Sequence, residues 1–477
     1  MPMVGAGISR RAFAMAVTAL ALRAGDDGWI DLFDGGSSRG WAGNGVWKVS
    51  SGALAAVRGP ADFFYQGHDK QRLSSGDFEL EADLITPPGC QSALWLRASR
   101  SAEGSPTGLR ICLGRSAAAP HARTGSLESL RYLYKPFITD GKRFRIQVAV
   151  RAQTVQVRLN GMMVVSYTGS ETSIPSSGTI ALSTESADAS AQFLRVRARP
   201  LPEESSRVVA APEDDVARHI LELGRRNIPM ADLHVHLKSG LTAELAIGKS
   251  MRDGLEYGIA VNCGAGNAAQ NDQEAMQFIE SLQGQPCFVA MQAEGREWTQ
   301  MFTREAAARF DYIFTDSMTW SDNRGKRMRL WMPEEVGTIS NVQEFMDTLV
   351  DRTVGILERE PIDIYVNPTY LPDQIAAQYE QLWTESRRRR VIQAAVRNRV
   401  AIELNTRRSL PSPSFIRMAK AGGAKFTFGT NNAGPEDLAR CEYGLRMVDE
   451  CGLTADDFFV PLESEKAIDR KGAALKG

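Results

Sequence analysis

The hydrophobic pattern of the chain changes once, near residue 228. From residue 27 to residue 200, apolar and polar positions alternate in short segments such as DFELEADLI, RFRIQVAV and TVQVRLN, which Gly, Ser, Asp and Pro separate. A period of two is typical of strands with one buried face. Asn160-Gly161 lies between two such segments and predicts a tight hairpin. We therefore expect an antiparallel β-sandwich over residues 27–200.

Residues 228–462 instead alternate short apolar runs with amphipathic helical stretches. The seven runs are ADLHVHL, YGIAVNCG, PCFVAMQAEG, YIFTDSM, PIDIYVNPT, RVAIELNT and KFTFGTNN. Strands that alternate with helices predict a parallel sheet, and seven such units predict a TIM-like β/α barrel. Residues 201–227, rich in Pro, Ser and acidic residues, predict a linker that ends in a helix, and residues 463–477 form a tail.

The first 25 residues have the pattern of an export signal. The pair Arg10-Arg11 precedes an apolar run of about a dozen residues, too short for a permanent membrane span. The arginine pair is typical of a twin-arginine signal, which predicts a periplasmic or extracellular protein. No later stretch reaches the roughly 18 consecutive apolar residues of a membrane helix, so we expect no stable membrane span.

Composition narrows the functional classes. The 477 residues include 56 Lys+Arg and 57 Asp+Glu, and this balance argues against a nucleic-acid partner. The six cysteines form no C-x-x-C pair, so we expect free thiols in the core. Only five histidines are present, and two of them, His234 and His236, are almost adjacent.

Polar side chains end each of the seven predicted barrel strands. The carboxyl ends of parallel barrel strands meet at one rim, where catalytic groups collect. Polar residues also begin ordinary loops, but His, Glu, Asp and Asn at seven strand ends favour a functional rim. The candidates are His234, His236, Lys238, Asn262, Glu294, Arg296, Glu297, Asp316, Asn367, Glu403, Asn405 and Asn431.

The pair His234 and His236 predicts a metal site. A strand period of two directs both imidazoles to one face, and carboxylates on neighbouring strands would complete a divalent site. Glu294 and Glu297 are the carboxylate candidates, and Asp316 is a further one. Nitrogen and oxygen donors suit one or two ions of Zn, Mn or Fe and leave an open position for substrate or water.

The remaining candidates divide by chemistry. A Lewis-acidic metal polarises a carbonyl or generates hydroxide near neutral pH. Asp316 or Glu403 would act as general base, and Lys238 as an acid or electrostatic stabiliser. The residues expected to bind and orient a hydroxyl-rich substrate are Asn262, Arg296, Asn367, Asn405 and Asn431.

Residues 28–200 resemble the 3-keto-disaccharide hydrolase family. The resemblance is carried by WIDLFDGGSSRGW, GVWKVSSGAL, SALWLRAS and VRLNGMMVVSYT, and it implies a concanavalin-like jelly roll. The family usually carries an acidic residue and a glutamine in the strand that here reads GLRICLG, where Arg110 and Cys112 stand instead. This departure argues against catalysis by the sandwich and leaves glycan binding through Trp41, Trp47 or Tyr65.

Residues 228–462 resemble the polymerase-and-histidinol-phosphatase (PHP) family through ADLHVHLKSG. The resemblance implies a distorted seven-stranded barrel, metal-dependent phosphoester hydrolysis and His234 and His236 as ligands. EGREW resembles a later family motif, which carries Glu297 over as a ligand. Three family motifs with Asp or His appear here as Asn262-Cys263, Asn367-Pro368 and GTNNAG, so one or two metals are expected rather than three.

These observations favour an exported metal-dependent hydrolase or lyase that acts on a carbohydrate or 3-keto glycoside. Two alternatives stay open: a PHP-type phosphoesterase, and a non-catalytic glycan-binding protein with a degenerate barrel. The long segment 317–337, SMTWSDNRGKRMRLWMPEEVG, is a candidate lid in which Trp320 and Trp331 would stack on sugar. Packing of these tryptophans against the sandwich is the competing interpretation.

Overall fold

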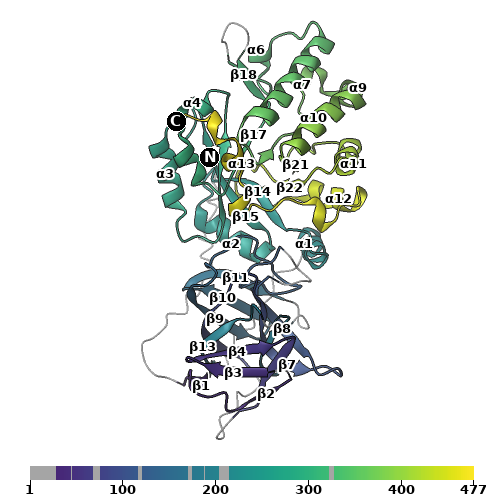
Figure 1. Cartoon of the computed structure of the whole chain (residues 1–477). Helices are drawn as coiled ribbons and strands as arrows, with labels where there is room; N and C mark the ends of the chain where they lie inside the picture. The colour runs from purple at the N-terminus through teal and green to yellow at the C-terminus, as the bar shows by residue number, and fades with distance from the viewer. Residues whose placement is uncertain are drawn as a thin grey trace, which may run out of the picture.

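The computed structural model describes residues 28–44, 46–67, 76–115, 121–169, 174–186, 188–202, 214–321 and 327–476. Within these ranges the chain forms a sandwich of strands and a barrel with outer helices, and the barrel stands on one end of the sandwich (Figure 1). The expected export signal, residues 1–25, lies outside the described residues. No helix in the described ranges is long and apolar enough to cross a membrane.

The first domain is the expected antiparallel sandwich. An eight-stranded sheet has the order β11-β10-β9-β6-β13-β4-β3, with β1 paired to β13, and a five-stranded sheet has the order β2-β5-β12-β7-β8. The strands are β1 Ile30–Phe33, β2 Trp41–Gly43, β3 Val46–Ser50, β4 Ala53–Arg58, β5 Ala61–Tyr65, β6 Phe78–Ile85, β7 Gln91–Arg100, β8 Pro106–Gly114, β9 Arg143–Arg151, β10 Thr154–Leu159, β11 Met162–Thr168, β12 Thr179–Thr184 and β13 Gln192–Pro200.

Alternation along the strands builds the sandwich core. Buried and less buried positions alternate along β9 and β10, as the sequence pattern predicted. Asn160 and Gly161 link β10 to β11 with φ angles of 49° and 87°, the left-handed backbone that a two-residue hairpin turn requires. The hairpin prediction is confirmed.

The aromatic residues expected to bind glycan from the sandwich lie in its packing instead. Trp41 and Tyr65 are buried, and the Trp41 indole donates a hydrogen bond to the carbonyl of Leu32 at 2.6 Å. Trp47 is half-buried and stacks on Phe63 with ring centroids 5.4 Å apart. The expectation of exposed aromatics is therefore wrong for Trp41 and Tyr65, because both rings pack in the hydrophobic core of the sandwich.

The second domain is a closed parallel barrel of seven strands, in the order in which they follow along the chain. They are β14 Ala231–His236, β15 Glu256–Cys263, β16 Phe288–Ala293, β17 Tyr312–Thr315, β20 Ile364–Tyr365, β21 Ala401–Asn405 and β22 Phe426–Gly429. Each predicted apolar run contains one strand, and nearly every strand residue is buried, as expected for a sheet covered by helices.

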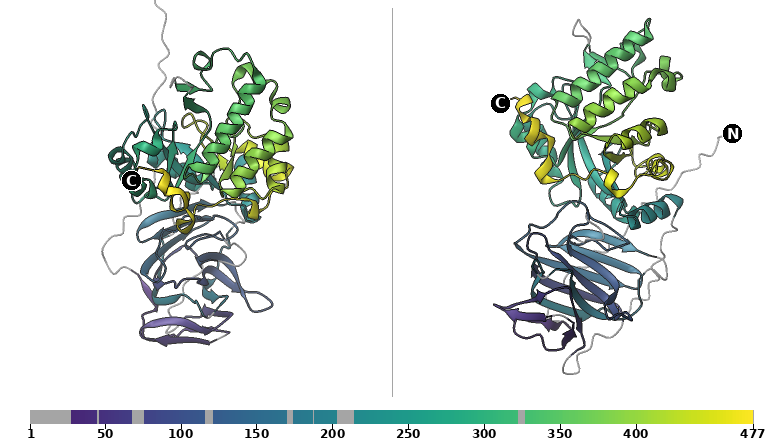
Figure 2. Two further views of the ribbon diagram at one scale, coloured as in Figure 1. Left: turned by 45° about the horizontal axis from the view of Figure 1, so that its top comes forward. Right: turned by 45° about the vertical axis from the view of Figure 1, so that its right-hand side comes forward.

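Helices follow most barrel strands and cover the outside of the barrel (Figure 2). Side-chain caps begin several of them, as when Thr242 accepts a hydrogen bond from the Leu245 amide at 3.2 Å. The helices are α1 Asp215–Arg225, α2 Ala243–Asp253, α3 Asp272–Ser281, α4 Trp298–Met301, α5 Arg304–Ala308, α6 Pro333–Val336, α7 Val342–Arg359, α8 Asp373–Ala376, α9 Tyr379–Leu382, α10 Glu385–Arg397, α11 Pro413–Ala421, α12 Glu442–Glu450 and α13 Ala467–Lys471, with 3₁₀ turns η1 Ala455–Asp457, η2 Glu463–Glu465 and η3 Gly472–Ala474.

A buried aspartate closes the barrel between its first and last strands. β14 and β22 share one pair in strand register, Asp232 with Phe428. The Asp232 carboxylate accepts hydrogen bonds from the amides of His234 at 3.2 Å and Thr430 at 3.0 Å, and from the Thr430 hydroxyl. Side-chain hydrogen bonds therefore supplement the short ladder at this seam.

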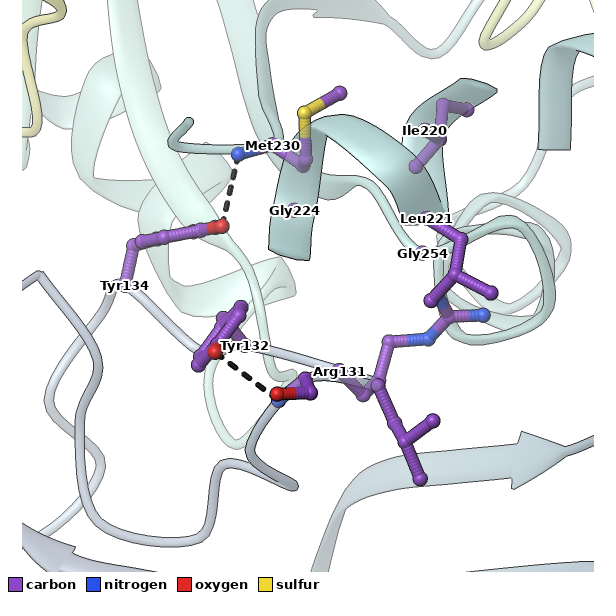
Figure 3. A pocket seen from close by; sticks show the side chains of 10 residues that line it. Arg131, Tyr132, Tyr134, Ile220, Leu221, Gly224, Met230 and Gly254 are labelled. Carbon is purple, nitrogen blue, oxygen red and sulfur yellow. Dashed lines mark hydrogen bonds between the residues drawn. The ribbon is translucent and has the colours of Figure 1, made fainter. Parts of the chain in front are cut away.

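The sandwich covers the amino-terminal end of the barrel, opposite the rim with the candidate residues. Tyr134, in the loop between β8 and β9, accepts a hydrogen bond from the Met230 amide through its hydroxyl at 2.8 Å (Figure 3). The Tyr134 amide donates to the Glu256 carboxylate at 2.6 Å, and the Lys135 ammonium lies 2.6 Å from Asp311. Met230, Glu256 and Asp311 precede or begin β14, β15 and β17.

A crevice remains beside this junction, between the same sandwich loop and α1. Arg131, Tyr132, Tyr134 and Gly254 help to line it (Figure 3). Its volume is about 10 Å³, room for about one water molecule. It is therefore too small to admit a substrate.

The expected tail, residues 463–477, packs on the barrel through its described residues. The Lys466 ammonium donates to the carbonyl of Phe310 at 2.8 Å, and the Ala467 amide donates to Asp363 at 2.6 Å. Ala467 and Ile468 of α13 are buried.

Candidate functional site

His234 and His236 lie at the carboxyl end of β14 and are both buried, with 1% and 2% of their surface exposed. The His236 Nδ1 lies 3.2 Å from the carbonyl oxygen of Ala260, and the His234 Nδ1 lies 2.5 Å from the Glu403 carboxylate. The Nε2 atom of each ring is buried without a hydrogen-bond partner. Burial, followed by the charges of His234 and Lys238, holds the pKa of His236 well below its usual value, which keeps that ring neutral.

Glu403, on β21, is enclosed by hydrogen-bond donors. One carboxylate oxygen contacts His234. The other accepts hydrogen bonds from the backbone N–H of Asn367 at 2.6 Å and from the side chain of Asn405 at 2.9 Å. The residue is completely buried. Glu403, a predicted general base, therefore contacts the His234 ring and orients it.

The rim asparagines predicted to bind substrate form a network around Asn367. The side-chain oxygen Oδ1 of Asn367 accepts hydrogen bonds from the side chains of Asn405 and Asn431, each at 3.1 Å. The side-chain Nδ2 of Asn367 donates to Asp316 at 3.2 Å. Asn367 and Asn431 have φ angles of 46° and 49°, a left-handed backbone that Asn tolerates better than most residues. The structure thus brings these three amides together, bonded to one another.

Two buried carboxylates lie on the neighbouring strands. Glu294 follows β16, where its carboxylate accepts from Asn262 at 3.1 Å and Gln292 at 2.7 Å. Burial, and next the negative charge of Asp316, raise the pKa of Glu294 to about 7. Asp316 follows β17, and burial also raises its pKa. Glu294 therefore titrates near neutral pH, as a residue that transfers protons must.

One predicted residue, Glu297, is not brought into this group, whereas the Arg296 guanidinium reaches it and donates to the carbonyl of Asp316 at 3.3 Å. Glu297 is exposed, and its carboxylate accepts a hydrogen bond from the Arg296 amide at 2.9 Å. The Arg296 guanidinium donates to Glu360 at 2.8 Å and to Thr315 at 2.9 Å. The structure thus engages Arg296 in an ion pair that anchors the loop after β16, and Glu297 lies at the beginning of α4.

Lys238 lies on the loop after β14 and is exposed. Burial of part of the side chain lowers the pKa of Lys238, and the positive charge of Arg407 lowers it further, while Glu294 acts in the opposite direction. Lys238 thus lies on the carboxyl rim of the barrel, where the charges of Arg407 and Glu294 act on it in opposite directions.

Three further residues belong to this site: Gln292 and Phe314, which were not predicted, and Asn432, which the sequence places with Asn431 at the polar end of the seventh strand. Gln292 is two positions before Glu294 on the same strand, so the period of two was the available signal. Asn432 bonds the His236 backbone twice, by accepting from the amide at 2.7 Å and donating to the carbonyl at 2.9 Å. Phe314 packs against the His234 ring with centroids 4.7 Å apart, and its apolar strand gave no signal of that role.

The donor set fits a metal through two nitrogens. Each Nε2 is buried without a partner, and each Nδ1 is fixed by an oxygen, which is the outer contact that metal-bound histidines usually make. The described residues include no group of three or more His, Cys, Asp or Glu side chains that could hold a metal ion. The fit thus rests on His234 and His236 alone.

The candidate lid is a hairpin of β18 Thr319–Ser321 and β19 Arg327–Arg329, followed by α6. Trp320 is buried, with the Arg352 guanidinium 4.6 Å from its ring centroid, while Trp331 is 39% exposed. Trp320 packs against Phe345 of α7, with ring centroids 5.9 Å apart. Trp320 therefore packs within the barrel domain rather than on the sandwich.

A second polar cluster lies on the five-stranded sheet of the sandwich. Arg110 of β8 pairs with Glu128 and, at 2.8 Å, with Glu185, while the Trp95 indole donates to the Ser183 hydroxyl at 2.8 Å. Cys112 is buried beside Glu128. All six cysteines are free and buried, as predicted.

The fold and these sites define a two-domain protein, an antiparallel sandwich joined to a closed seven-stranded parallel barrel. Residues 28–198, the sandwich, match the family model described as a 3-keto-alpha-glucoside-1,2-lyase-like domain. This confirms the resemblance predicted for that region. The match ends before the barrel, so the PHP resemblance of residues 228–462 gains no support from it.

Solved structures resemble the chain over about a third of its length. The "putative glycosyl hydrolase" of Parabacteroides distasonis ATCC 8503 is 15% identical, covering 36% of this chain and 94% of its own, with a TM-score of 0.30. The VIP36 exoplasmic/lumenal domain in its Ca²⁺/Man2-bound form is 13% identical, covering 35% and 83%, with a TM-score of 0.28. The carbohydrate-binding module CBM66 of Bacillus subtilis is 16% identical, covering 34% and 92%, with a TM-score of 0.22. These likenesses are too weak to carry a functional argument, and no curated protein matches the chain.

Proposed function

We propose that this protein is a metal-dependent hydrolase or lyase that acts on a carbohydrate at the carboxyl rim of its barrel. The observation that carries the proposal is the pair of buried imidazoles, each with Nδ1 fixed by an oxygen and Nε2 without a partner. Desolvating two such nitrogens without compensation is costly, and a shared cation would compensate both. The carbohydrate class comes from the family match of residues 28–198.

Each group at the rim has a role in this proposal. A divalent metal held by His234 and His236 would supply Lewis acidity to the substrate. Glu294, with a pKa of about 7, is the residue best suited to accept and return a proton, and Asp316 is the second carboxylate. Glu403 and the asparagine network hold His234 and Asp316 in place. Hydrolysis and β-elimination both need these groups, so the proposal covers both reactions.

The first test is metal content and turnover in the full chain. We expect protein purified without chelators to bind about one equivalent of Zn, Mn or Fe, and His234→Ala to lose it while remaining folded. His219→Ala is the matched control, because His219 pairs with Asp449 between α1 and α12, away from the rim. Absence of metal after reconstitution would overturn the proposal.

Substrate choice is tested with the same protein. Release of reducing sugar from a 3-keto-glucoside, lost on addition of a chelator, is the expected result. Turnover of an aryl phosphate with no action on the glucoside would instead favour a phosphoesterase.

A second function, glycan binding by the sandwich, is favoured by the half-buried Trp95 beside Arg110 and Ser183 in the family-matched region. Aromatic rings beside polar side chains are suited to sugar contacts. Retention of the full chain on immobilised polysaccharide, reduced in Trp95→Ala and unchanged in His234→Ala, would support this function. Equal retention of Trp95→Ala and the unaltered protein would exclude it.

A further inference from the structure

Three cationic side chains from three different loops gather at the mouth of the barrel site. Lys238 follows β14, Arg407 follows β21 and Arg327 begins β19 of the hairpin after β17. Arg327 donates to the carbonyl of Ala265 after β15 and Arg407 to that of Asn431 after β22, and β15 and β22 are the two strands that flank β14 in the barrel. Three loops that are far apart in sequence therefore place cationic side chains on the same side of the carboxyl rim.

None of the three has a carboxylate within ion-pair distance in the described ranges. Arg327 donates to the carbonyl of Ala265 at 2.8 Å, and Arg407 donates to the carbonyl of Asn431 at 3.3 Å. The Arg327 Nε is buried without a partner. Lys238 has no side-chain hydrogen bond to any residue that the structure describes.

Two neighbouring arginines, in contrast, form ion pairs with carboxylates, so the absence of an ion pair is particular to the three cations at the mouth. Arg329, two residues after Arg327 on the same strand, is paired with Glu335. Arg296 pairs with Glu360 at 2.8 Å. Like charges placed together without an ion-pair partner repel one another, so a cation cluster of this kind is typical of a site that binds an anion.

We infer that the site takes a sugar that carries an anionic group, a carboxylate or a phosphate, and that Lys238, Arg327 and Arg407 bind this group. The inference rests on the proposed function and names its substrate class. With a divalent ion at the histidines, the three cations and the metal together exceed the charge of the nearby carboxylates Glu294, Asp316 and Glu403 and of Asp437, whose charge acts on Lys238. An anionic substrate would offset the excess, and the guanidinium groups can bind planar carboxylate or phosphate oxygens in pairs.

The test is calorimetric titration of the metal-loaded full chain with glucuronate, glucose 6-phosphate and glucose. We expect at least one of the two anionic sugars to bind about tenfold or more tightly than glucose, with an affinity that falls as salt is raised. The preferred anion distinguishes a carboxylate from a phosphate. Arg407→Gln should remove most of the preference, and Arg389→Gln, an exposed residue of α10, should leave it unchanged.

The outcomes separate this inference from the function on which it rests. Binding of glucose as tight as that of both anionic sugars would overturn the inference and leave a neutral-sugar enzyme. Metal-loaded protein that binds none of the three sugars would overturn it as well. Protein that cannot be loaded with metal would overturn the proposed function itself.

Discussion

At the scale of single residues, the orientation of the His234 ring depends on one carboxylate. Glu403 accepts from the His234 Nδ1 on one oxygen and from two nitrogens on the other. A ring held in this way presents its Nε2 lone pair outward, which is the tautomer that binds a metal. Glu403 therefore acts through His234, as a positioning residue.

We predict that Glu403→Gln lowers metal affinity by about 10- to 100-fold, the usual effect of losing an outer-shell contact. The amide would also oppose one of the donors that Glu403 now accepts from, at a cost of about 1–3 kcal/mol in the free energy of unfolding. Competition with a metal-binding dye measures the first effect, and urea denaturation measures the second.

Glu297→Gln is the matched control, because Glu297 is exposed and contacts the Arg296 amide. Its metal affinity should equal that of the unaltered protein. Equal affinities in Glu403→Gln and Glu297→Gln would show that Glu403 has no influence on a metal site.

The site was predictable in part, for a reason visible in these residues. The pair His234 and His236 was predictable from the sequence, because residues i and i+2 of a strand lie on the same face of the sheet. Glu297 was chosen from a motif, but the chain turns after Gly295 and leaves it in solvent. His234 and Asn367, two of the partners of Glu403, come from other strands or the loops after them, and no local pattern encodes which acid will contact a histidine.

At the scale of secondary structure, the apolar runs located all seven barrel strands, since each strand must be buried on both faces. The charge run SRRRR at residues 386–390 predicts a solvated helix face, but α10 buries Arg387 and Arg388. Their carboxylate partners, Asp347 and Glu380, come from α7 and α9. Burial of a charge is decided by partners distant in sequence, which a helical pattern does not contain.

The seam between β14 and β22 gives a prediction at this scale. Asp232→Ala leaves three buried donors without an acceptor, namely the His234 amide and the Thr430 amide and hydroxyl. We expect the free energy of unfolding to fall by about 3 kcal/mol or more. Thermal denaturation followed by circular dichroism measures it, with the exposed Asp215→Ala as control. A loss below about 1 kcal/mol would mean that the backbone ladder alone closes the barrel.

At the scale of the whole molecule, the sandwich covers the end of the barrel opposite the histidines (Figure 2). The domain boundaries followed from the change in periodicity, but the docking face did not. Tyr134 and Glu256 are 122 positions apart, and each is a single residue in an otherwise ordinary segment. The arrangement leaves the carboxyl rim uncovered by the sandwich, so the barrel site and the five-stranded sheet would act on separate ligands.

Glu256 makes this junction sensitive to pH. Its buried carboxyl accepts hydrogen bonds from the amides of Tyr134 at 2.6 Å and Lys135 at 3.2 Å, and burial raises its pKa to about 8. The unfolded chain has the ordinary value near 4.5. Between these two values the folded protein keeps a proton that the unfolded chain releases, so stability falls as the pH rises through this range.

We therefore expect the free energy of unfolding to decrease from pH 5 to pH 8, with a contribution from Glu256 on the order of a few kcal/mol. Glu256→Gln cannot ionise, so its stability should depend less on pH across this range, even if its stability at pH 5 is lower. The exposed Glu244→Gln should retain the pH dependence of the unaltered protein. Urea denaturation at each pH gives the three curves. Identical slopes for Glu256→Gln and Glu244→Gln would mean that the Tyr134 and Lys135 amides offset the cost of burying an ionised Glu256, and that the domain junction does not respond to pH through this residue.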